Sequence, residues 1–310
     1  GMAEVFAAFD RVRGERVALK FFRTTVSHSQ ESKERFLREG RLLLSFDHPH
    51  IVRVHDSGEL ADESFFLAME LLPGRSLRDH LKQRWPLQDV WPFACQVAGA
   101  LLYAHSEGVI HRDLKPENLF VLSRHPMAAK VLDFGVAKVA GESPMTQTGQ
   151  ILGTPKYMSP EQLTGVRDID VRTDIYSLGL VLLEMLTGES VFSASSSAAL
   201  IVKILDTSHA GLADGTPLPE RWKRLLNQMT HFDRERRCAS MLEVVERLHG
   251  LVDDSADGDL PTAIDYLPTE RSPAVNKKAS NQNKALAVTQ NLRAQSERPK
   301  SGIPSTMSLG

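Results

Sequence analysis

The sequence of 310 residues is short of cysteine, of excess charge and of long apolar runs. Its two cysteines, Cys95 and Cys238, are too few and too far apart for a disulfide framework or a thiolate metal site, so we expect reduced thiols in a core. The formal net charge of −2 gives no electrostatic footprint for a nucleic acid or an anionic membrane. The longest apolar runs fall short of the ~20 residues that cross a bilayer, and no secretory signal opens the chain. These absences predict a soluble, cytoplasmic protein with no nucleic-acid partner and no membrane segment.

Aromatic residues are also scarce, and none follows Tyr266. From residue 252 the chain is acidic and then rich in Asn, Gln, Lys, Ser and Pro, which cannot bury enough apolar surface to offset its ordering entropy. We therefore predict a disordered tail at residues 252–310. Within it Leu260-Pro261-Thr262 recurs as Leu267-Pro268-Thr269. The repeat is either a chance recurrence or a pair of threonines whose phosphorylation creates a docking site for a phosphothreonine-binding partner.

Residues 1–72 are predicted to form short strands around one helix. Lys20 lies in an apolar strand, where a lysine is either an edge-strand gatekeeper or a functional cation. A helical pattern from Ser29 to Phe46 places Glu39 beside its apolar stripe, either solvated or paired with Lys20. Gly40 should weaken this helix by up to ~1 kcal/mol, which a helix that moves could tolerate. Strands are predicted at residues 1–6, 17–22, 51–54 and 65–70, with the last two separated by a polar turn containing Asp56, Gly58 and Asp62.

Pro73-Gly74 interrupts this pattern, and residues 73–251 are predicted to be mainly helical. One apolar helix spans residues 90–106. The most hydrophobic helix, Ile175 to Leu186, should be buried on all sides and end at Gly188. Between these helices lies a polar surface loop at residues 141–149. The change from strands to helices marks a boundary between two lobes.

One stretch carries the chemistry, the run from His111 to Asn118, which is followed by Asp133-Phe134-Gly135. It places the acid Asp113, Lys115, Asn118 and a second acid, Asp133, in order. Carboxylate and amide oxygens are the ligands that Mg²⁺ prefers, and a lysine can neutralise phosphate charge. The pattern therefore indicates phosphoryl transfer from a metal-bound nucleotide.

Together with Val17-Ala18-Leu19-Lys20 and Ser159-Pro160-Glu161, this stretch resembles the protein-kinase signature set in order and spacing. The resemblance covers residues 1 to about 251. Lys115 and Gly153-Thr154-Pro155 resemble serine/threonine kinases, and the start of the chain looks most like their bacterial (Hanks-type) members. The resemblance implies an α+β, two-lobed kinase-like fold, with a small β-rich N-lobe at residues 1–72 and a larger, mainly helical C-lobe at 73–251. It also implies ATP with Mg²⁺, or with Mn²⁺ in its place, as cofactors and protein Ser/Thr hydroxyls as substrates.

The resemblance implies a role for each matched residue. Asp113 would orient the substrate hydroxyl, Lys115 would neutralise the transferred phosphate, and Thr154 would brace both. Asn118 and Asp133 would hold the metal, while Lys20, fixed by Glu39, would bind the inner phosphates. Glu161 would pair with Arg237 as a buried salt bridge. The residues expected around the nucleotide are Gly1, Val5, Ala18, Lys20, Met69 beside a rear pocket, Glu70, Leu72 and Phe120.

Regulation is expected at Arg112, which precedes the catalytic acid. Phosphorylation of Thr146 or Thr148, by the kinase itself, would supply an anionic partner for this cation and order the loop.

The chain departs from the family pattern at its first residues. Ala3 stands at the third position of the glycine-rich loop, Gly1 is either a remnant of that loop or an expression scar, and the first strand is missing, so the next strand should have an open edge. Two alternatives to an active kinase therefore remain. One is a kinase-like scaffold or weakly active pseudokinase, and the other is a small-molecule phosphotransferase, which has no need of the segment from Gly153 to Glu161.

Overall fold

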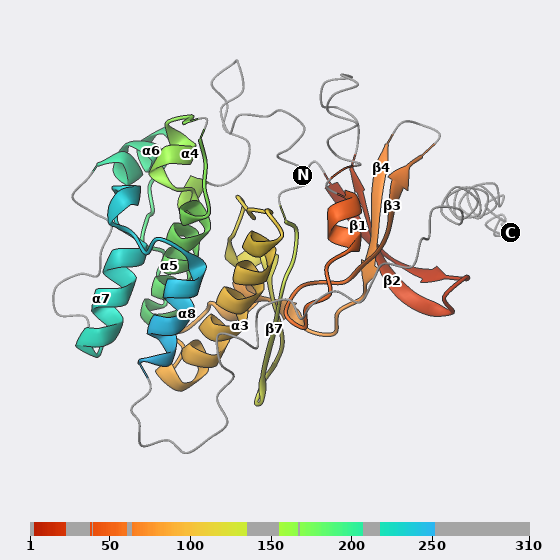
Figure 1. Cartoon of the computed structure of the whole chain (residues 1–310), viewed down its shortest axis with the longest axis horizontal. Helices are drawn as coiled ribbons and strands as arrows, with labels where there is room; N and C mark the ends of the chain where they lie inside the picture. The colour runs from red at the N-terminus through yellow and green to blue at the C-terminus, as the bar shows by residue number, and fades with distance from the viewer. Residues whose placement is uncertain are drawn as a thin grey trace, which may run out of the picture.

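The structure, a computed structural model, describes residues 3–22, 38, 40–60, 64–134, 155–166, 168–206 and 218–251. A β-sheet part and a helical part lie side by side, as Figure 1 shows. Several predicted site residues fall outside the described residues, namely Gly1, Glu39, Thr146, Thr148 and Thr154, as does the tail.

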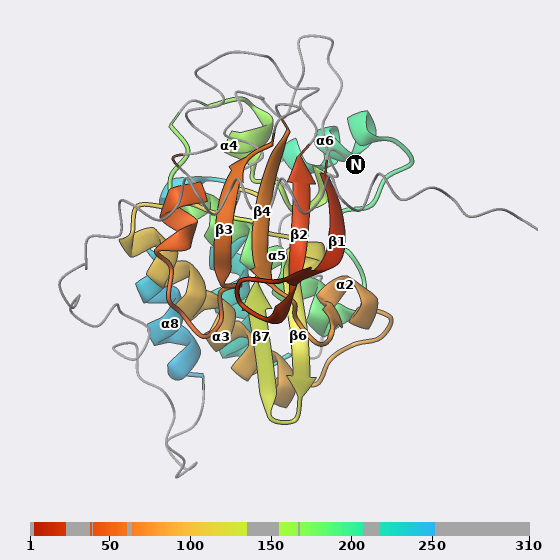
Figure 2. The same ribbon diagram turned by 90° about the vertical axis from the view of Figure 1, so that its right-hand side faces the viewer.

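The first part is an antiparallel sheet of four strands in the order β1-β2-β4-β3 (Figure 2). Its strands are β1 (Ala3–Asp10), β2 (Glu15–Phe22), β3 (Val54–Glu59) and β4 (Phe65–Glu70). The β1–β2 turn uses Gly14 in the left-handed region at φ 73°, which only glycine adopts without strain. Among the described residues β1 pairs with β2 alone, so the predicted edge strand is confirmed.

The register of this sheet places four residues in one row across it. Val5 is opposite Lys20, Lys20 is opposite Leu67, and Leu67 is opposite Ser57. Directly opposite residues in a sheet project from the same face. The row therefore links the first strand to β3 on the face that carries Lys20.

The predicted strand at residues 51–54 is wrong in its bounds, because β3 begins at Val54 and continues to Glu59. Asp56 and Gly58, which were expected in a turn, pair with Ala68 and Phe66 of β4. A sheet edge accepts such polar residues when its partner strand supplies the apolar contacts. At Gly58 a Cβ would come within 2.9 Å of the Phe66 ring, so this position has no room for a side chain.

The second part contains the helices α2 (Leu77–His80), α3 (Leu87–Ser106), α4 (Pro160–Leu163), α5 (Arg172–Thr187), α6 (Ser197–Leu205), α7 (Glu220–Met229) and α8 (Met241–His249). The apolar helix predicted at 90–106 is α3. The helix predicted from Ile175 is α5, which is buried along nearly its whole length and is capped by Gly188 at φ 77°. In Figure 1, α5 runs between α3 and the outer helices α6 and α7.

The prediction of a mainly helical second part missed a small sheet. It consists of β5 (Arg75–Ser76), β6 (Leu119–Arg124) and β7 (Met127–Val131), in that order. β6 and β7 bury alternate residues, which is the period-2 pattern of a half-buried strand. Gln96 links α3 to β7, because its side-chain amide donates to the Met127 carbonyl and accepts from the Ala129 N–H, both at 2.9 Å.

Gly74 lies where the chain passes from β4 to this sheet. Its φ is 129°, and a Cβ there would meet the Val121 carbonyl oxygen at 2.3 Å. The glycine of the predicted break is therefore required by a close backbone approach. Within the described ranges, no helix is both long enough and apolar enough to span a membrane.

Candidate active site

The buried carboxylate of Asp174, in the first turn of α5, binds the start of the stretch from His111 to Asn118. The Asp174 oxygens accept hydrogen bonds from the backbone N–H of His111 at 2.8 Å, from that of Arg112 at 2.9 Å and from His105 Nε2 at 2.8 Å. Burial raises the pKa of Asp174, but His105 and the backbone donors outweigh burial and hold that pKa below its ordinary value. The carboxylate is therefore ionised at neutral pH and fixes the loop.

Arg112 bends the loop at this point. Its φ of 62° is in the left-handed region, which is strained for a residue other than glycine. The surrounding contacts must offset this strain. Its N–H is fixed by Asp174, and its carbonyl accepts from Gln162 Nε2 at 2.8 Å. The side chain of Arg112 is exposed. Both peptide groups around Arg112 are thus anchored, and the next residue, Asp113, takes its direction from them.

Asp113, Lys115 and Asn118 meet as predicted. Lys115 Nζ is 2.7 Å from Asp113 Oδ2, and Asn118 Nδ2 donates to the Asp113 carbonyl at 2.8 Å and to Oδ2 at 3.2 Å. Asn118 is buried at the end of a 3₁₀ turn, Pro116–Asn118. Because its amide nitrogen faces Asp113, its amide oxygen is the atom left for a cation.

Asp133 follows the end of β7, and the N–H of the residue before it, Leu132, donates to the Asn118 carbonyl at 2.8 Å. His111 Nε2 donates to the Leu132 carbonyl at 2.8 Å, and the His111 ring lies 4.8 Å from the Phe134 ring. Phe134 is 2% exposed, and Asp133 has φ 57°. The buried Phe134 ring thus anchors the segment that carries Asp133.

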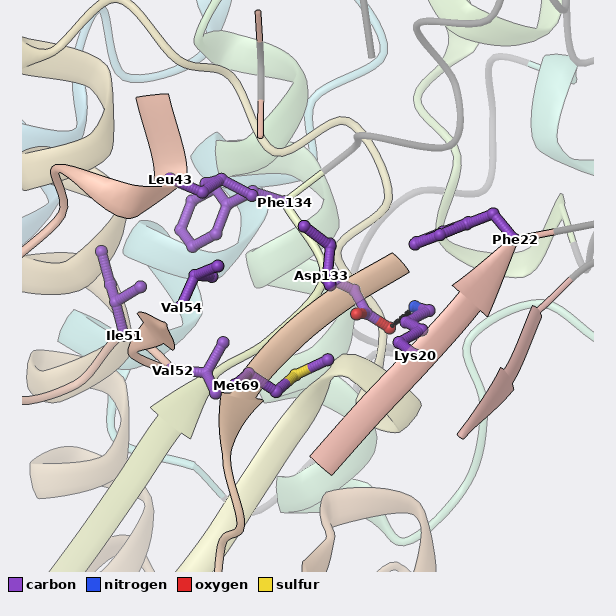
Figure 3. Close-up of a pocket in the computed structure, with 10 residues that line it drawn as sticks. Lys20, Phe22, Leu43, Ile51, Val52, Val54, Met69, Asp133 and Phe134 are labelled. Carbon is purple, nitrogen blue, oxygen red and sulfur yellow. Dashed lines mark ion pairs between the residues drawn. The ribbon is translucent and has the colours of Figure 1, made fainter. Parts of the chain in front are cut away.

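Lys20 joins the two parts of the fold. Its Nζ is 2.6 Å from Asp133 Oδ2, an ion pair between β2 and the segment after β7 (Figure 3). The Lys20 side chain is 14% exposed, so this pair is partly shielded from solvent. Of the two alternatives for Lys20, the gatekeeper and the functional cation, its position beside Asp133 favours the second.

A pocket lies beside this ion pair, and both Lys20 and Asp133 line it. In Figure 3, Asp133 and Lys20 lie at the centre and right, Leu43 and Phe134 at the upper left, and Met69 below. The prediction that Met69 lines a rear pocket is therefore consistent with the structure. The remaining lining side chains are Phe22, Ile51, Val52, Val54 and Leu67.

Of the described residues expected around the nucleotide, Lys20 and Met69 line this pocket, whereas Val5, Ala18, Glu70, Leu72 and Phe120 do not. Ala18 is opposite Met69 in the sheet, and both Ala18 and Leu72 are half-buried against the core. Phe120 is half-buried in β6, and Val5 is 60% exposed. The Glu70 carboxylate accepts from Lys130 Nζ at 2.6 Å and from the Arg53 N–H at 2.8 Å, so it ties β4 to β7. Its side chain is thus engaged, and its backbone N–H donates to the Arg53 carbonyl at 3.0 Å.

The predicted buried pair of Glu161 and Arg237 is present. Arg237 donates from both terminal nitrogens to Glu161, at 2.7 and 2.8 Å, and its side chain is 0% exposed. Burial raises the pKa of Glu161, but the Arg237 guanidinium outweighs burial and lowers it. This bidentate pair fixes α4 to the segment before α8.

Sequence reasoning missed two groups. Asp174 was seen as the start of a helix, although an acid that opens an otherwise buried helix must itself be paired, and that signal was available. The second group joins Arg78 to Glu117 at 2.9 Å, to Glu184 at 2.7 Å and to the Tyr157 hydroxyl, which also donates to Glu184. Nothing in the spacing of these four residues indicates that they meet.

A two-part fold in which a strand lysine meets an acid beside an Asp-Lys-Asn loop defines a protein kinase domain. The protein kinase domain family model matches residues 1–248, and the chain belongs to this family. The predicted two-lobed α+β fold is confirmed, and so is the resemblance to bacterial Hanks-type kinases.

The chain is similar to serine/threonine-protein kinases of bacteria. The chain is 39% identical to the serine/threonine-protein kinase pkn3 of Myxococcus xanthus, over 66% of this chain and 39% of that protein. It is 34% identical to the serine/threonine-protein kinase PrkC of Bacillus subtilis, over 72% of this chain and 33% of that protein. The chain thus spans about a third of the length of these relatives.

Among solved structures, the kinase domain of PknI from Mycobacterium tuberculosis superposes with a TM-score of 0.60 at 25% identity, covering 81% of this chain and 92% of that one. Rad53 in complex with AMP-PNP gives a TM-score of 0.65 at 25% identity, covering 80% of this chain and 61% of that one. Membership of the family implies ATP and a divalent metal as cofactors.

Proposed function

We propose that this chain is a serine/threonine protein kinase that transfers the γ-phosphoryl group of ATP to hydroxyls of proteins. The observation that carries the proposal is the Lys20–Asp133 ion pair next to the hydrogen-bonded group of Asp113, Lys115 and Asn118, to which the Leu132 N–H is joined by a 2.8 Å hydrogen bond to the Asn118 carbonyl. The serine/threonine class rests on Lys115 and on the names of the relatives.

The residues fit a nucleotide with Mg²⁺. Asn118 and Asp133 offer an amide oxygen and a carboxylate, and Mg²⁺ prefers oxygen ligands of this kind together with phosphate oxygens. Mn²⁺ accepts the same ligands. When bound, the metal neutralises charge on the phosphates. Lys20 would bind the inner phosphates with its ammonium group, and Glu39 would hold that lysine.

In the reaction, the substrate hydroxyl oxygen forms a bond to the γ-phosphorus while the bond from that phosphorus to the bridging oxygen of ADP breaks. Asp113 would orient the hydroxyl and accept its proton. Lys115, 2.7 Å from Asp113, would neutralise charge on the transferred group, and Thr154 would brace both side chains. The adenine would contact Ala18, Leu72 and Phe120.

We extend the proposal to regulation and organisation. Phosphorylation of Thr146 or Thr148 by the kinase itself would place an anion near Arg112. The lobes would comprise residues 1–72 and 73–251, followed by a tail at 252–310 with Thr262 and Thr269 as sites for a phosphothreonine-binding partner. Because ATP is the donor, the domain would work in the cytoplasm.

The test of the proposal is transfer of labelled phosphate from MgATP to the chain and to a generic protein substrate, with Asp113→Asn as the control. Label on serine or threonine that disappears in the variant supports the proposal. Binding of MgATP without transfer would instead favour the scaffold alternative.

A further inference from the structure

Arg78, in α2, joins three segments that lie far apart in the sequence. Its Nε donates to the Glu117 carboxylate at 2.9 Å, and one terminal nitrogen donates to Glu184 at 2.7 Å. The other terminal nitrogen donates to the Tyr157 hydroxyl, which itself donates to the second Glu184 oxygen. Every nitrogen of the guanidinium group is therefore engaged, and so are both oxygens of Glu184.

The cluster contains two carboxylates and one cation. Burial lowers the pKa of Arg78, but its hydrogen bonds to Glu117 and Glu184 outweigh burial and raise that pKa, so the guanidinium is charged. Burial and the Glu184 carboxylate raise the pKa of Tyr157, so its hydroxyl is neutral. The Glu184 side chain is 6% exposed, and a buried carboxylate of this kind needs a counter-charge. Arg78 supplies that charge to both acids.

Glu117 brings this cluster next to the catalytic loop. It precedes Asn118, whose amide nitrogen is 3.2 Å from Asp113 Oδ2, and α2 lies against the 3₁₀ turn that contains both residues. The Glu117 side chain is 47% exposed. An extended peptide advances ~3.3 Å per residue. A substrate whose hydroxyl lies at Asp113 therefore carries a neighbouring side chain past the exposed Glu117.

We propose that Arg78 is a specificity-determining residue, which occupies the position between Glu117 and Glu184 that a basic side chain of a substrate would otherwise take. A guanidinium group fits this position because the two carboxylates already lie at hydrogen-bonding distance from one. The wild-type chain therefore does not select arginine or lysine beside the acceptor hydroxyl. This inference rests on the proposed function, since it needs a protein substrate at Asp113.

The test removes the cation and measures peptide preference. Arg78→Met keeps most of the apolar stem of the side chain but leaves both carboxylates without their cation. kcat/KM is measured for peptides with a single serine, in which each neighbouring position in turn holds alanine or arginine. In Arg78→Met, arginine at one position should raise kcat/KM about tenfold over alanine, as a charge-assisted hydrogen bond can, while the wild type differs by less than about twofold there.

The carboxylate that faces the substrate provides the first control. Glu117→Gln in the Arg78→Met background should abolish the gained preference. In the wild-type background Glu117→Gln should leave the peptide preference unchanged, because Arg78 already occupies the position. This second comparison contains no substitution of Arg78, so it decides the question even where Arg78→Met does not fold.

Two further controls separate specificity from a structural role. Arg84→Met changes an exposed arginine, whose Nε donates to the Thr187 carbonyl at 3.1 Å, and it should show the wild-type preference. Methylguanidinium added to Arg78→Met should occupy the vacated position and reduce the gained preference for arginine. A merely structural role of Arg78 predicts no such competition.

Three results would overturn the proposal. They are a wild-type preference for arginine that Glu117→Gln abolishes, no gained preference in folded Arg78→Met, and a gain that persists after Glu117→Gln. A wild-type chain that transfers phosphate but gives any of these results refutes this inference alone. A wild-type chain that transfers phosphate to none of the peptides refutes the proposed function, and the substrate selection with it.

Discussion

Replacing Asp174 tests how the catalytic loop is held. Asp174→Ala removes a buried carboxylate that accepts three hydrogen bonds, from His105 and from the N–H groups of His111 and Arg112. Each buried donor left without an acceptor costs about 1–3 kcal/mol, so we expect a loss of at least ~3 kcal/mol in the free energy of unfolding. Asp174→Asn keeps the volume and one acceptor oxygen, and it should lose roughly half as much.

Activity should fall further than stability alone explains. The strained φ of Arg112 is maintained by contacts to Asp174 and Gln162, and Asp113 follows directly. Release of that strain would move the Asp113 carboxylate, and a displacement of about 1 Å can cost ~10²-fold in turnover. Urea unfolding gives the stability, and phosphate transfer on the folded fraction gives the activity.

The pH dependence of the Asp174 effect has a defined sign. The folded-state pKa of Asp174 is below its ordinary value of 3.8, so its contribution is fully present above that pH and is lost as the pH falls through the folded pKa. The stability gap between wild type and Asp174→Asn should therefore shrink in acid. Asp168→Asn is the matched control, since Asp168 is 88% exposed and should change stability by less than about 0.5 kcal/mol. Equal urea unfolding midpoints for wild type and Asp174→Ala would show that Asp174 does not hold the catalytic loop.

Three further outcomes are expected. Lys20→Met should weaken MgATP binding about tenfold, measured by calorimetry, because it removes the charged donor that is proposed to bind the phosphates beside Asp133. Unchanged affinity would contradict this role of Lys20. Glu161→Gln should cost about 3–5 kcal/mol in urea unfolding by leaving buried Arg237 without its counter-charge, and the lowered pKa of Glu161 means that this loss shrinks as the pH falls below 4.5. Burial raises the pKa of the Cys95 thiol to about 12, so iodoacetamide at pH 8 should label it only after unfolding, and rapid labelling of native protein would disprove its burial.

Local patterns were enough to predict the catalytic loop. Asp113, Lys115 and Asn118 lie within six consecutive residues, so their meeting needs little tertiary information. The apolar helix α5 and its glycine cap also follow from residues near in sequence. These features depend on hydrogen bonds between residues close in sequence and on the spacing of apolar residues along one helix.

The missed features depend on contacts between distant residues. The strands β6 and β7 were hidden because short apolar runs do not distinguish a strand from a helix without a partner. Asp174 is more than 60 residues from the loop it holds, and Arg78 is 106 residues from Glu184. Each role becomes visible only when the fold brings the two segments together.

The central claim is that Asp113 and its neighbours transfer phosphate from ATP to protein hydroxyls. The most direct measurement is incorporation of labelled γ-phosphate from MgATP into serine and threonine by the wild-type chain and by Asp113→Asn, at matched folded concentration. We expect incorporation by the wild type and a loss of several orders of magnitude in the variant, with MgATP affinity retained. Equal incorporation by both proteins, or none by a wild type that binds MgATP, would contradict it.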